Sequence, residues 1–322
     1  MKLNIKIFFS CLFITAIFSQ PVAAQYPVKP IKMILPFPAG SGVDGLVRIL
    51  GPAMSLSLGQ PIIVDYKPGG DGAIAASEVM RANPDGYTLL FATNSPMNSV
   101  PAMRKISPYD PINDFTPIGL VSRYLHYVLV NPQIPVKNIT EFFNYAKDHP
   151  NTLNYGSGGT FHHISSVELM KLGGFNATHV YYKGEPQALM DLLAGRLQFM
   201  VCSQSSSMQF VRDGKLRALL STSSKRSALD PNTPTMAEIG MPAFTTYPWS
   251  GIFGPAKLPK PIIERLNRAL NDALNRPDVR EQLIQRAMEP LGGSPLDLEV
   301  LNKEQLAVAH RVVRELNLSQ TD

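Results

Sequence analysis

The sequence predicts an α/β protein built from two lobes, and three observations carry this prediction. Short β-rich runs alternate with helical segments between residues 31 and 93, a pattern typical of a parallel sheet. A second alternating unit occupies residues 140–222. The apolar segment 118–132 lies between the two units and is long for a single strand. We therefore expect this segment to run from one lobe into the other.

The first unit reads as strand, helix, strand, helix, strand. The helical segment after the first strand carries an apolar stripe that includes Leu46, Ile49 and Leu50 at helical spacing. Pro36 and Pro38 cannot donate to a ladder, so the first strand should end before Phe37. Residues 94–114 are rich in Pro and Asn and are predicted as a loop. The predicted strands are 31–37, 61–66 and 87–93, and the predicted helices are 44–58 and 73–81.

The second unit repeats this alternation, and residues 244–255 then resemble a return crossing. Trp249, the only tryptophan, is expected to pack at this hinge. Open parallel sheets present strand ends and helix starts to a crevice, so a ligand cleft is expected between the lobes. The predicted helices are 140–149, 163–172, 186–195, 260–275, 278–288 and 297–316, and the predicted strands are 152–157, 178–183, 197–202 and 216–222. The predicted lobes are 25–124 plus 248–322, and 125–247.

Residues 1–24 have the pattern of a secretory signal peptide. Lys2 and Lys6 precede an apolar core that is too short to span a bilayer, and small residues follow at 22–24. We expect cleavage after Ala24 and a periplasmic location. A retained membrane anchor is the alternative, and it would need a longer apolar run.

Composition narrows the class of partner. The predicted signal holds two of the 30 basic residues and none of the 25 acidic ones, which leaves a net charge of +3. The basic residues are scattered without interleaved aromatics, so nucleic acid is not an expected partner. Only Cys202 remains after cleavage, so the mature chain can form no internal disulfide. A mild positive charge is compatible with a small anionic ligand.

The stretch ILPFPAGSGVDG contains Gly40, Gly42 and Gly45 at the spacing of a dinucleotide-binding loop, and Asp65 follows twenty residues after Gly45. The two prolines make this loop wider than such a fingerprint requires, so no nucleotide cofactor is expected. Backbone amides of residues 39–42 would still lie at a helix start, which favours a carboxylate or phosphate. Asp44 could accept from the same amides. An ordinary glycine-rich turn without a ligand is the alternative.

The sequence gives only weak signals for catalysis or metal binding. The run YGSGG does not match the nucleophile elbow of hydrolases, so a pair of Ser157 with a histidine is not expected to be catalytic. His162 and His163 are adjacent on a predicted helix and should point apart, and no cluster of Cys and His supports a metal site. His179 is expected in the core. We therefore predict no catalytic residue, no metal and no cofactor.

Nearly the whole mature chain resembles Bug-type proteins, the solute-binding components of tripartite tricarboxylate transporters. The resemblance starts at YPVKPIKMILPFPAGSGVD and continues through PIIVDYKPGGDGAIAA, NPDGYTLLFAT, YDPINDFTPIGLV, HVYYKGEPQALMDLLAGRLQFM and WSGIFGPAKLPKPIIERLN. It implies a type II periplasmic binding-protein fold, with two Rossmann-like lobes, a two-crossing hinge and a ligand cleft between the lobes. It also implies capture of a small carboxylate by a monomer that delivers it to integral-membrane transporter subunits.

The resemblance also implies a set of ligand contacts. Amides at one helix start in each lobe would hold the two ends of a dicarboxylate. Cys202 stands where an acidic residue is common in the family, and Lys183 faces either the ligand or solvent. A sensor and an exported enzyme are the alternative functions. The implied contacts are Phe37, Ala39, Gly40, Ser41, Asp44, Thr93, Asn94 and Ser95 in the first lobe, and Ser157, Gly158, Gly159, Thr160, Lys183, Gly184, Glu185, Pro186 and Cys202 in the second.

Overall fold

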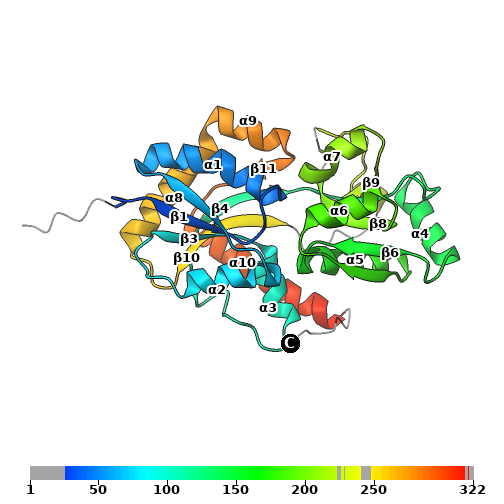
Figure 1. Cartoon of the computed structure of the whole chain (residues 1–322), viewed down its shortest axis with the longest axis horizontal. Coiled ribbons are helices and arrows are strands. Elements are labelled where there is room, and N and C mark those ends of the chain that lie inside the picture. The colour runs from blue at the N-terminus through cyan, green and yellow to red at the C-terminus, as the bar shows by residue number, and fades with distance from the viewer. Residues whose placement is uncertain (1–25, 223–225, 228, 241–247, 316–317, 319–322) are drawn as a thin grey trace, which may run out of the picture.

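The computed structural model describes residues 26–222, 226–227, 229–240, 248–315 and 318. The predicted signal peptide, residues 1–24, lies outside the described residues, and so do residues 244–247 of the predicted return crossing. Among the described helices, none combines the length and the apolar character needed to cross a membrane. The elements gather into two α/β lobes (Figure 1).

The first lobe contains a six-stranded mixed sheet in the order β11-β4-β10-β3-β1-β2. Strand β1 pairs in parallel with β2 and β3, whereas β10 is antiparallel to β3 and β4. The return strand β10 therefore lies inside the sheet. The strands are β1 (Ile31–Leu35), β2 (Ile62–Tyr66), β3 (Thr88–Thr93), β4 (Phe115–Tyr124), β10 (Trp249–Pro255) and β11 (Met288–Pro290).

Helices cover both faces of this sheet, as Figure 1 shows with α1, α8 and α9 on one side and α2 and α10 on the other. Met33 and Leu35 pack in the cluster that includes α1 and α8, whereas Ile34 packs in the cluster that includes α2 and α10. This alternation explains why β1 is apolar at nearly every position. The helical elements are α1 (Gly42–Leu58), η1 (Gly70–Gly72), α2 (Ala73–Met80), η2 (Ser95–Ser99), α3 (Val100–Met103), α8 (Lys260–Asn275), α9 (Pro277–Gln285) and α10 (Pro295–Glu315).

The second lobe contains a five-stranded sheet in the order β7-β6-β8-β5-β9. Helices α4 and α5 contribute to the core on one face, and α6 contributes to the core on the other. The strands are β5 (His126–Val130), β6 (Asn154–Ser157), β7 (Thr178–Tyr181), β8 (Phe199–Ser203) and β9 (Arg217–Ser221). The helices are α4 (Ile139–Asp148), α5 (Thr160–Gly173), α6 (Glu185–Leu193), α7 (Gln204–Arg212) and η3 (Ala237–Ile239).

The predicted crossing at 118–132 is confirmed. Strand β4 belongs to the first sheet and β5 to the second, so the chain changes sheets at Leu125. The first strand ends at Leu35, as the two prolines predict. The lobe boundaries 25–124 plus 248–322 and 125–247 remain a prediction.

Three predictions of local structure were wrong. The predicted loop 94–114 contains η2 and α3, which follow each other without a break, and Pro96 stands in the first turn, where its missing N–H costs nothing. The helix predicted at 278–288 ends at Gln285, and β11 then pairs with β4. Helix α7 was not predicted, since its serine-rich sequence has low helix propensity.

Candidate functional site

A cavity lies between the two sheets, and loops that follow the strands of both lobes line it. These loops come from the β1–α1, β3–η2, β6–α5, β7–α6 and β8–α7 connections, together with the crossing at residues 124–126. The lining residues are Phe37, Pro38, Ser41, Gly42, Val43, Thr93, Asn94, Ser95, Tyr124, His126, Gly158, Phe161, His162, Gly184, Glu185, Pro186, Ser203, Ser205, Pro248 and Met288.

About half of the predicted contacts lie on this cavity, although their contact with a ligand remains a prediction. The residues that line it are Phe37, Ser41, Thr93, Asn94, Ser95, Gly158, Gly184, Glu185 and Pro186. The predicted contacts that lie elsewhere are Ala39, Gly40, Asp44, Ser157, Gly159, Thr160, Lys183 and Cys202. Sequence reasoning missed Tyr124, Phe161, Ser203 and Met288 and gave His126 no role.

The start of α1 is capped from within the first lobe. Gly40 has a φ of +83°, and its amide donates to Asp44 Oδ2 at 2.9 Å. The Ser41 amide donates to the Pro38 carbonyl, so two of the four amides predicted to be open already have protein partners. The role of Asp44 as a first-turn acceptor is confirmed.

Two side chains also hold the Asp44 carboxylate. Tyr66 Oη donates to Asp44 Oδ1 at 2.6 Å, and Arg48 Nε donates to the same oxygen at 3.0 Å. Burial alone would raise the pKa of Asp44, but the hydrogen bonds from Gly40, Tyr66 and Arg48 outweigh burial and lower it. Asp44 is therefore an ionised structural acceptor inside the first lobe.

The start of α5 is capped from the opposite lobe. Gly159 at the N-cap offers no side chain of its own, and the Thr160 amide donates to Asp71 Oδ2 at 2.8 Å. Thr160 Oγ1 donates to the same oxygen, and Tyr181 Oη donates to Asp71 Oδ1 at 3.3 Å. Asp71 belongs to η1 of the first lobe, so this carboxylate ties the two lobes together beside the cavity. The sequence indicated only a turn at this position.

A close backbone approach places the start of α6 beside the β6–α5 loop. A Cβ on Gly158 would lie 2.1 Å from the backbone nitrogen of Glu185, so only glycine fits there. Glu185 is the first residue of α6 and is buried on the cavity wall. The packing of Gly158 therefore fixes where the Glu185 side chain begins.

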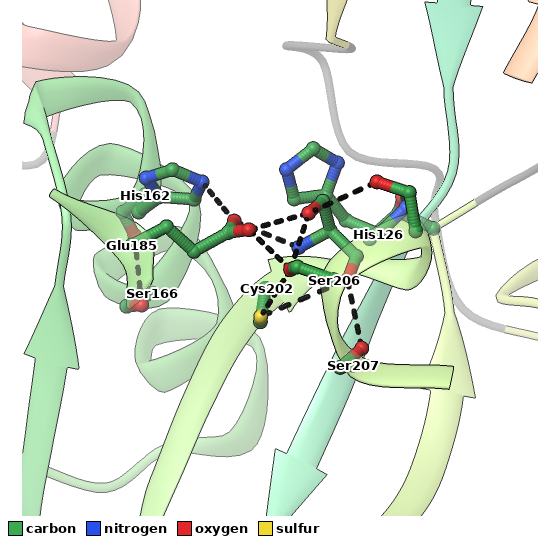
Figure 2. Close-up of polar contacts among 10 residues, drawn as sticks. His126, His162, Ser166, Glu185, Cys202, Ser206 and Ser207 are labelled. Carbon is green, nitrogen blue, oxygen red and sulfur yellow. Dashed lines mark hydrogen bonds and ion pairs between the residues drawn. The ribbon is translucent and has the colours of Figure 1, made fainter. Parts of the chain in front are cut away.

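The Glu185 carboxylate accepts from four donors in the second lobe. Ser203 donates to it through its amide at 2.9 Å and through its hydroxyl at 2.5 Å. His162 Nε2 lies 3.0 Å from Oε2, and Ser206 donates to Oε1 (Figure 2). Burial alone would raise the pKa of Glu185, but its contacts with His162 and Ser203 outweigh burial, so the pKa lies well below its usual range.

His126 and His162 lie on the same wall as Glu185, with ring centroids 5.4 Å apart. Among the described residues, the Nδ1 atoms of both rings are buried without a hydrogen-bond partner. Burial lowers the pKa of His126 to about 3, so its imidazole is neutral at pH 7. One ligand-type atom from each of His126, His162 and Glu185 falls within 4.8 Å of the others. The prediction that no cluster supports His162 was wrong, because three distant segments converge here.

Ser157 and His179 do form a hydrogen bond, between Oγ and Nε2 at 2.7 Å. Ser157 is fully buried, and neither residue lines the cavity, so this hydroxyl is not presented to a ligand there. His163 bonds Tyr155 at 2.8 Å while His162 bonds Glu185. The prediction that the two adjacent histidines point apart is confirmed.

The remaining candidate residues lie in the core or at the surface and do not line the cavity. Cys202 is fully buried in the core of the second lobe, and burial raises the pKa of its thiol. Lys183 is exposed, and Asp65 forms ion pairs with Lys32 and Lys67 at the surface. Trp249 is fully buried with its indole donating to Asn98, so its predicted packing role is confirmed.

Sequence comparison identifies a family that matches most of the chain. Residues 46–318 match the family model described as the tripartite tricarboxylate transporter family receptor, TctC. The protein BugT of Bordetella pertussis is 30% identical over 305 residues, an alignment that covers 94% of each chain.

Two solved structures of similar proteins contain carboxylates. The R. palustris protein Rpa4515 with adipate is 29% identical, has a TM-score of 0.86, and matches over 91% of this chain and 98% of its own. MatC from Rhodopseudomonas palustris with bound malate is 30% identical, has a TM-score of 0.84, and matches over 89% of this chain and all of its own.

Proposed function

The chain belongs to the tripartite tricarboxylate transporter receptor family, TctC, and we propose that it captures a small carboxylate between its lobes outside the cytoplasm. It then delivers this solute to the membrane subunits of a tripartite transporter and performs no chemistry on it. The signal peptide predicted at residues 1–24 would export the chain to the periplasm.

The observation that carries the proposal is a cavity whose walls come from both lobes. A ligand that contacts both walls stabilises the arrangement in which the lobes are closed. Ligand binding and lobe closure are thereby coupled. Thr93, Asn94 and Ser95 supply polar groups on the first-lobe wall. Ser41 Oγ also lines the cavity, and it is buried without a hydrogen-bond partner among the described residues. Adipate and malate in the two similar structures support a carboxylate as the ligand.

Thermal unfolding with a panel of carboxylates tests this proposal. Malate, adipate, a tricarboxylate and an aromatic monocarboxylate should be compared with their uncharged amides. Once its concentration exceeds the dissociation constant, a bound carboxylate should raise the melting temperature with the logarithm of that concentration. The matching amide should leave the melting temperature unchanged. Native mass spectrometry should then recover one unmodified ligand per chain. Absence of any shift across the panel, or recovery of a chemically altered ligand, would contradict the proposal.

A further inference from the structure

Three side chains of metal-ligating types lie close together on the second-lobe wall. His126 is the first residue of β5, His162 lies in the first turn of α5, and Glu185 is the first residue of α6. One donor atom from each lies within 4.8 Å of the other two. Two imidazoles and one carboxylate are a common set in zinc sites that keep a coordination position open.

The separation of these donor atoms is close to what coordination requires. Donors about 2.1 Å from a tetrahedral zinc ion lie roughly 3.4 Å from one another. His162 Nε2 and Glu185 Oε2 are already 3.0 Å apart, and no pair exceeds 4.8 Å.

The unpartnered nitrogens provide a second, independent observation. His126 is 4% exposed, yet its Nδ1 has no hydrogen-bond partner among the described residues, and the same holds for Nδ1 of His162. A buried polar atom left without a partner destabilises the folded chain. Both residues line the cavity, so beside the space that an ion would occupy each ring has a nitrogen without a hydrogen-bond partner among the described residues.

Neighbouring groups hold the cluster in place, as outer-shell residues do around metals. Ser203 and Ser206 donate to Glu185, so its carboxylate stays oriented when Oε2 exchanges His162 for an ion. The His126 carbonyl accepts from the Thr222 amide at 2.9 Å, which anchors the backbone of that residue. In Figure 2 the Glu185 carboxylate points between His162 and Ser206.

Charge favours a cation over an organic anion at this wall. Glu185 is the acidic residue among those that line the cavity, and like charges repel strongly in a partly buried site. A divalent ion would reverse the sign of the wall and make it attractive to an anionic solute.

We propose that His126, His162 and Glu185 bind one divalent transition-metal ion of the zinc class, whose open position takes a carboxylate of the captured solute. The second half of this statement rests on the proposed function, whereas the metal site does not. Imidazole-rich sites favour Zn²⁺, Ni²⁺ or Cu²⁺ over Mg²⁺ and Ca²⁺, which prefer sites made only of oxygen.

Metal titration without any carboxylate tests the site itself. Zn²⁺ should bind the chelator-treated full chain with a stoichiometry of one by calorimetry, and Co²⁺ should give the visible absorption of a four-coordinate ion. His126→Gln, His162→Gln and Glu185→Gln should each weaken Zn²⁺ binding by more than about 100-fold, beyond the effect of an outer-shell change. His149→Gln, at an exposed histidine, is the matched control and should leave binding unchanged.

The two histidine variants keep the test decisive if Glu185→Gln fails to fold, and thermal unfolding verifies each variant. The site is supported if the wild type binds one Zn²⁺ and the three cluster variants lose this binding while the His149→Gln control keeps it. No stoichiometric binding, or binding that survives both histidine substitutions, overturns it.

Titration of malate and adipate into the Zn²⁺-loaded and the chelated chain tests the bridging role. Tighter carboxylate binding to the loaded chain supports it. Equal binding to both forms overturns bridging and leaves the proposed function intact. The same conclusion holds if the histidine variants bind carboxylate more weakly without metal, because the histidines would then contact the carboxylate directly. Failure of every carboxylate in the wider panel to bind either form overturns bridging together with the proposed function, while Zn²⁺ titration still decides the metal site.

Discussion

Helices α1 and α5 both begin beside the cavity, and both use a carboxylate as their cap, but the carboxylates come from different places. Asp44 caps α1 from within its own first turn, and its partners Tyr66 and Arg48 belong to the same lobe. Asp71 caps α5 from the other lobe, beside the cavity. The first carboxylate satisfies the Gly40 amide, just before α1, and stabilises a lobe, whereas the second satisfies the amide of the first residue of α5 and stabilises the contact between lobes.

The largest effect is expected at the glycines that precede these helices. Gly158→Ala should lower the free energy of unfolding by about 3 kcal/mol or more, because the new Cβ would collide with the backbone at Glu185. Gly40→Ala is the matched variant before α1. It meets no described atom within 4 Å and should cost only about 1–2 kcal/mol for its positive φ. Urea denaturation followed by circular dichroism measures both, and equal losses would contradict the close approach at Gly158.

Removal of the cap inside the first lobe should have the next largest effect. Asp44→Ala leaves the Gly40 amide and the Tyr66 hydroxyl without their acceptor and should destabilise the fold by about 2 kcal/mol. Carboxylate affinity should change little, because Asp44 does not line the cavity. Urea denaturation and calorimetry give the two quantities. A normal unfolding curve with much weaker ligand binding would place Asp44 in the site instead.

Removal of the cap between the lobes should produce the reverse pattern. Asp71→Ala should change the free energy of unfolding by less than about 1 kcal/mol, since its partners lie across a solvent-accessible contact. Carboxylate affinity should fall by roughly 5–10-fold, because the closed arrangement loses a contact that capture needs. Small-angle X-ray scattering should show a larger average radius for this variant without ligand. An unchanged radius and unchanged affinity would show that this contact does not hold the lobes together.

The smallest effect is a dependence of stability on pH. The pKa of Asp44 is lower in the folded chain than its unfolded value of about 3.9. The ionised carboxylate therefore stabilises the fold at pH values above the unfolded pKa, and this contribution is lost as the pH falls through the folded pKa. Asp44→Asn should lose less stability than the wild type as the pH falls from about 5 through the unfolded value of about 3.9 and below it. Identical pH profiles by urea denaturation would contradict this assignment.

Local patterns in the sequence were sufficient for most of the fold. The apolar runs fixed the strand positions to within a few residues, and the length of 118–132 revealed a crossing between sheets. Pro36 and Pro38 correctly marked the end of β1. Pro96 and Pro101 misled the prediction because proline both interrupts helices and begins them, and only the chain around it decides which occurs.

The site was less accessible to sequence reasoning, because its groups meet only through tertiary structure. Glycine-rich loops after strands pointed to Ser41 and Gly158, since such loops border a crevice in any parallel sheet. Nothing local links His126, at the crossing from β4 to β5, to Glu185 at the start of α6. Asp71 likewise resembled an ordinary turn residue, because its partner Thr160 belongs to the other lobe.

The position of β10 has a consequence for the order in which the chain can fold during synthesis. This strand lies between β3 and β4, yet its residues follow the whole second sheet in the chain. All five strands of the second sheet are made before Trp249, so that sheet can close first. In the first sheet, the place between β3 and β4 stays unfilled until residues 249–255 have been synthesised. The first lobe is therefore the first to be synthesised but the last whose sheet can be completed. Until then its unpaired strand edges are a target for chaperones on newly made chains.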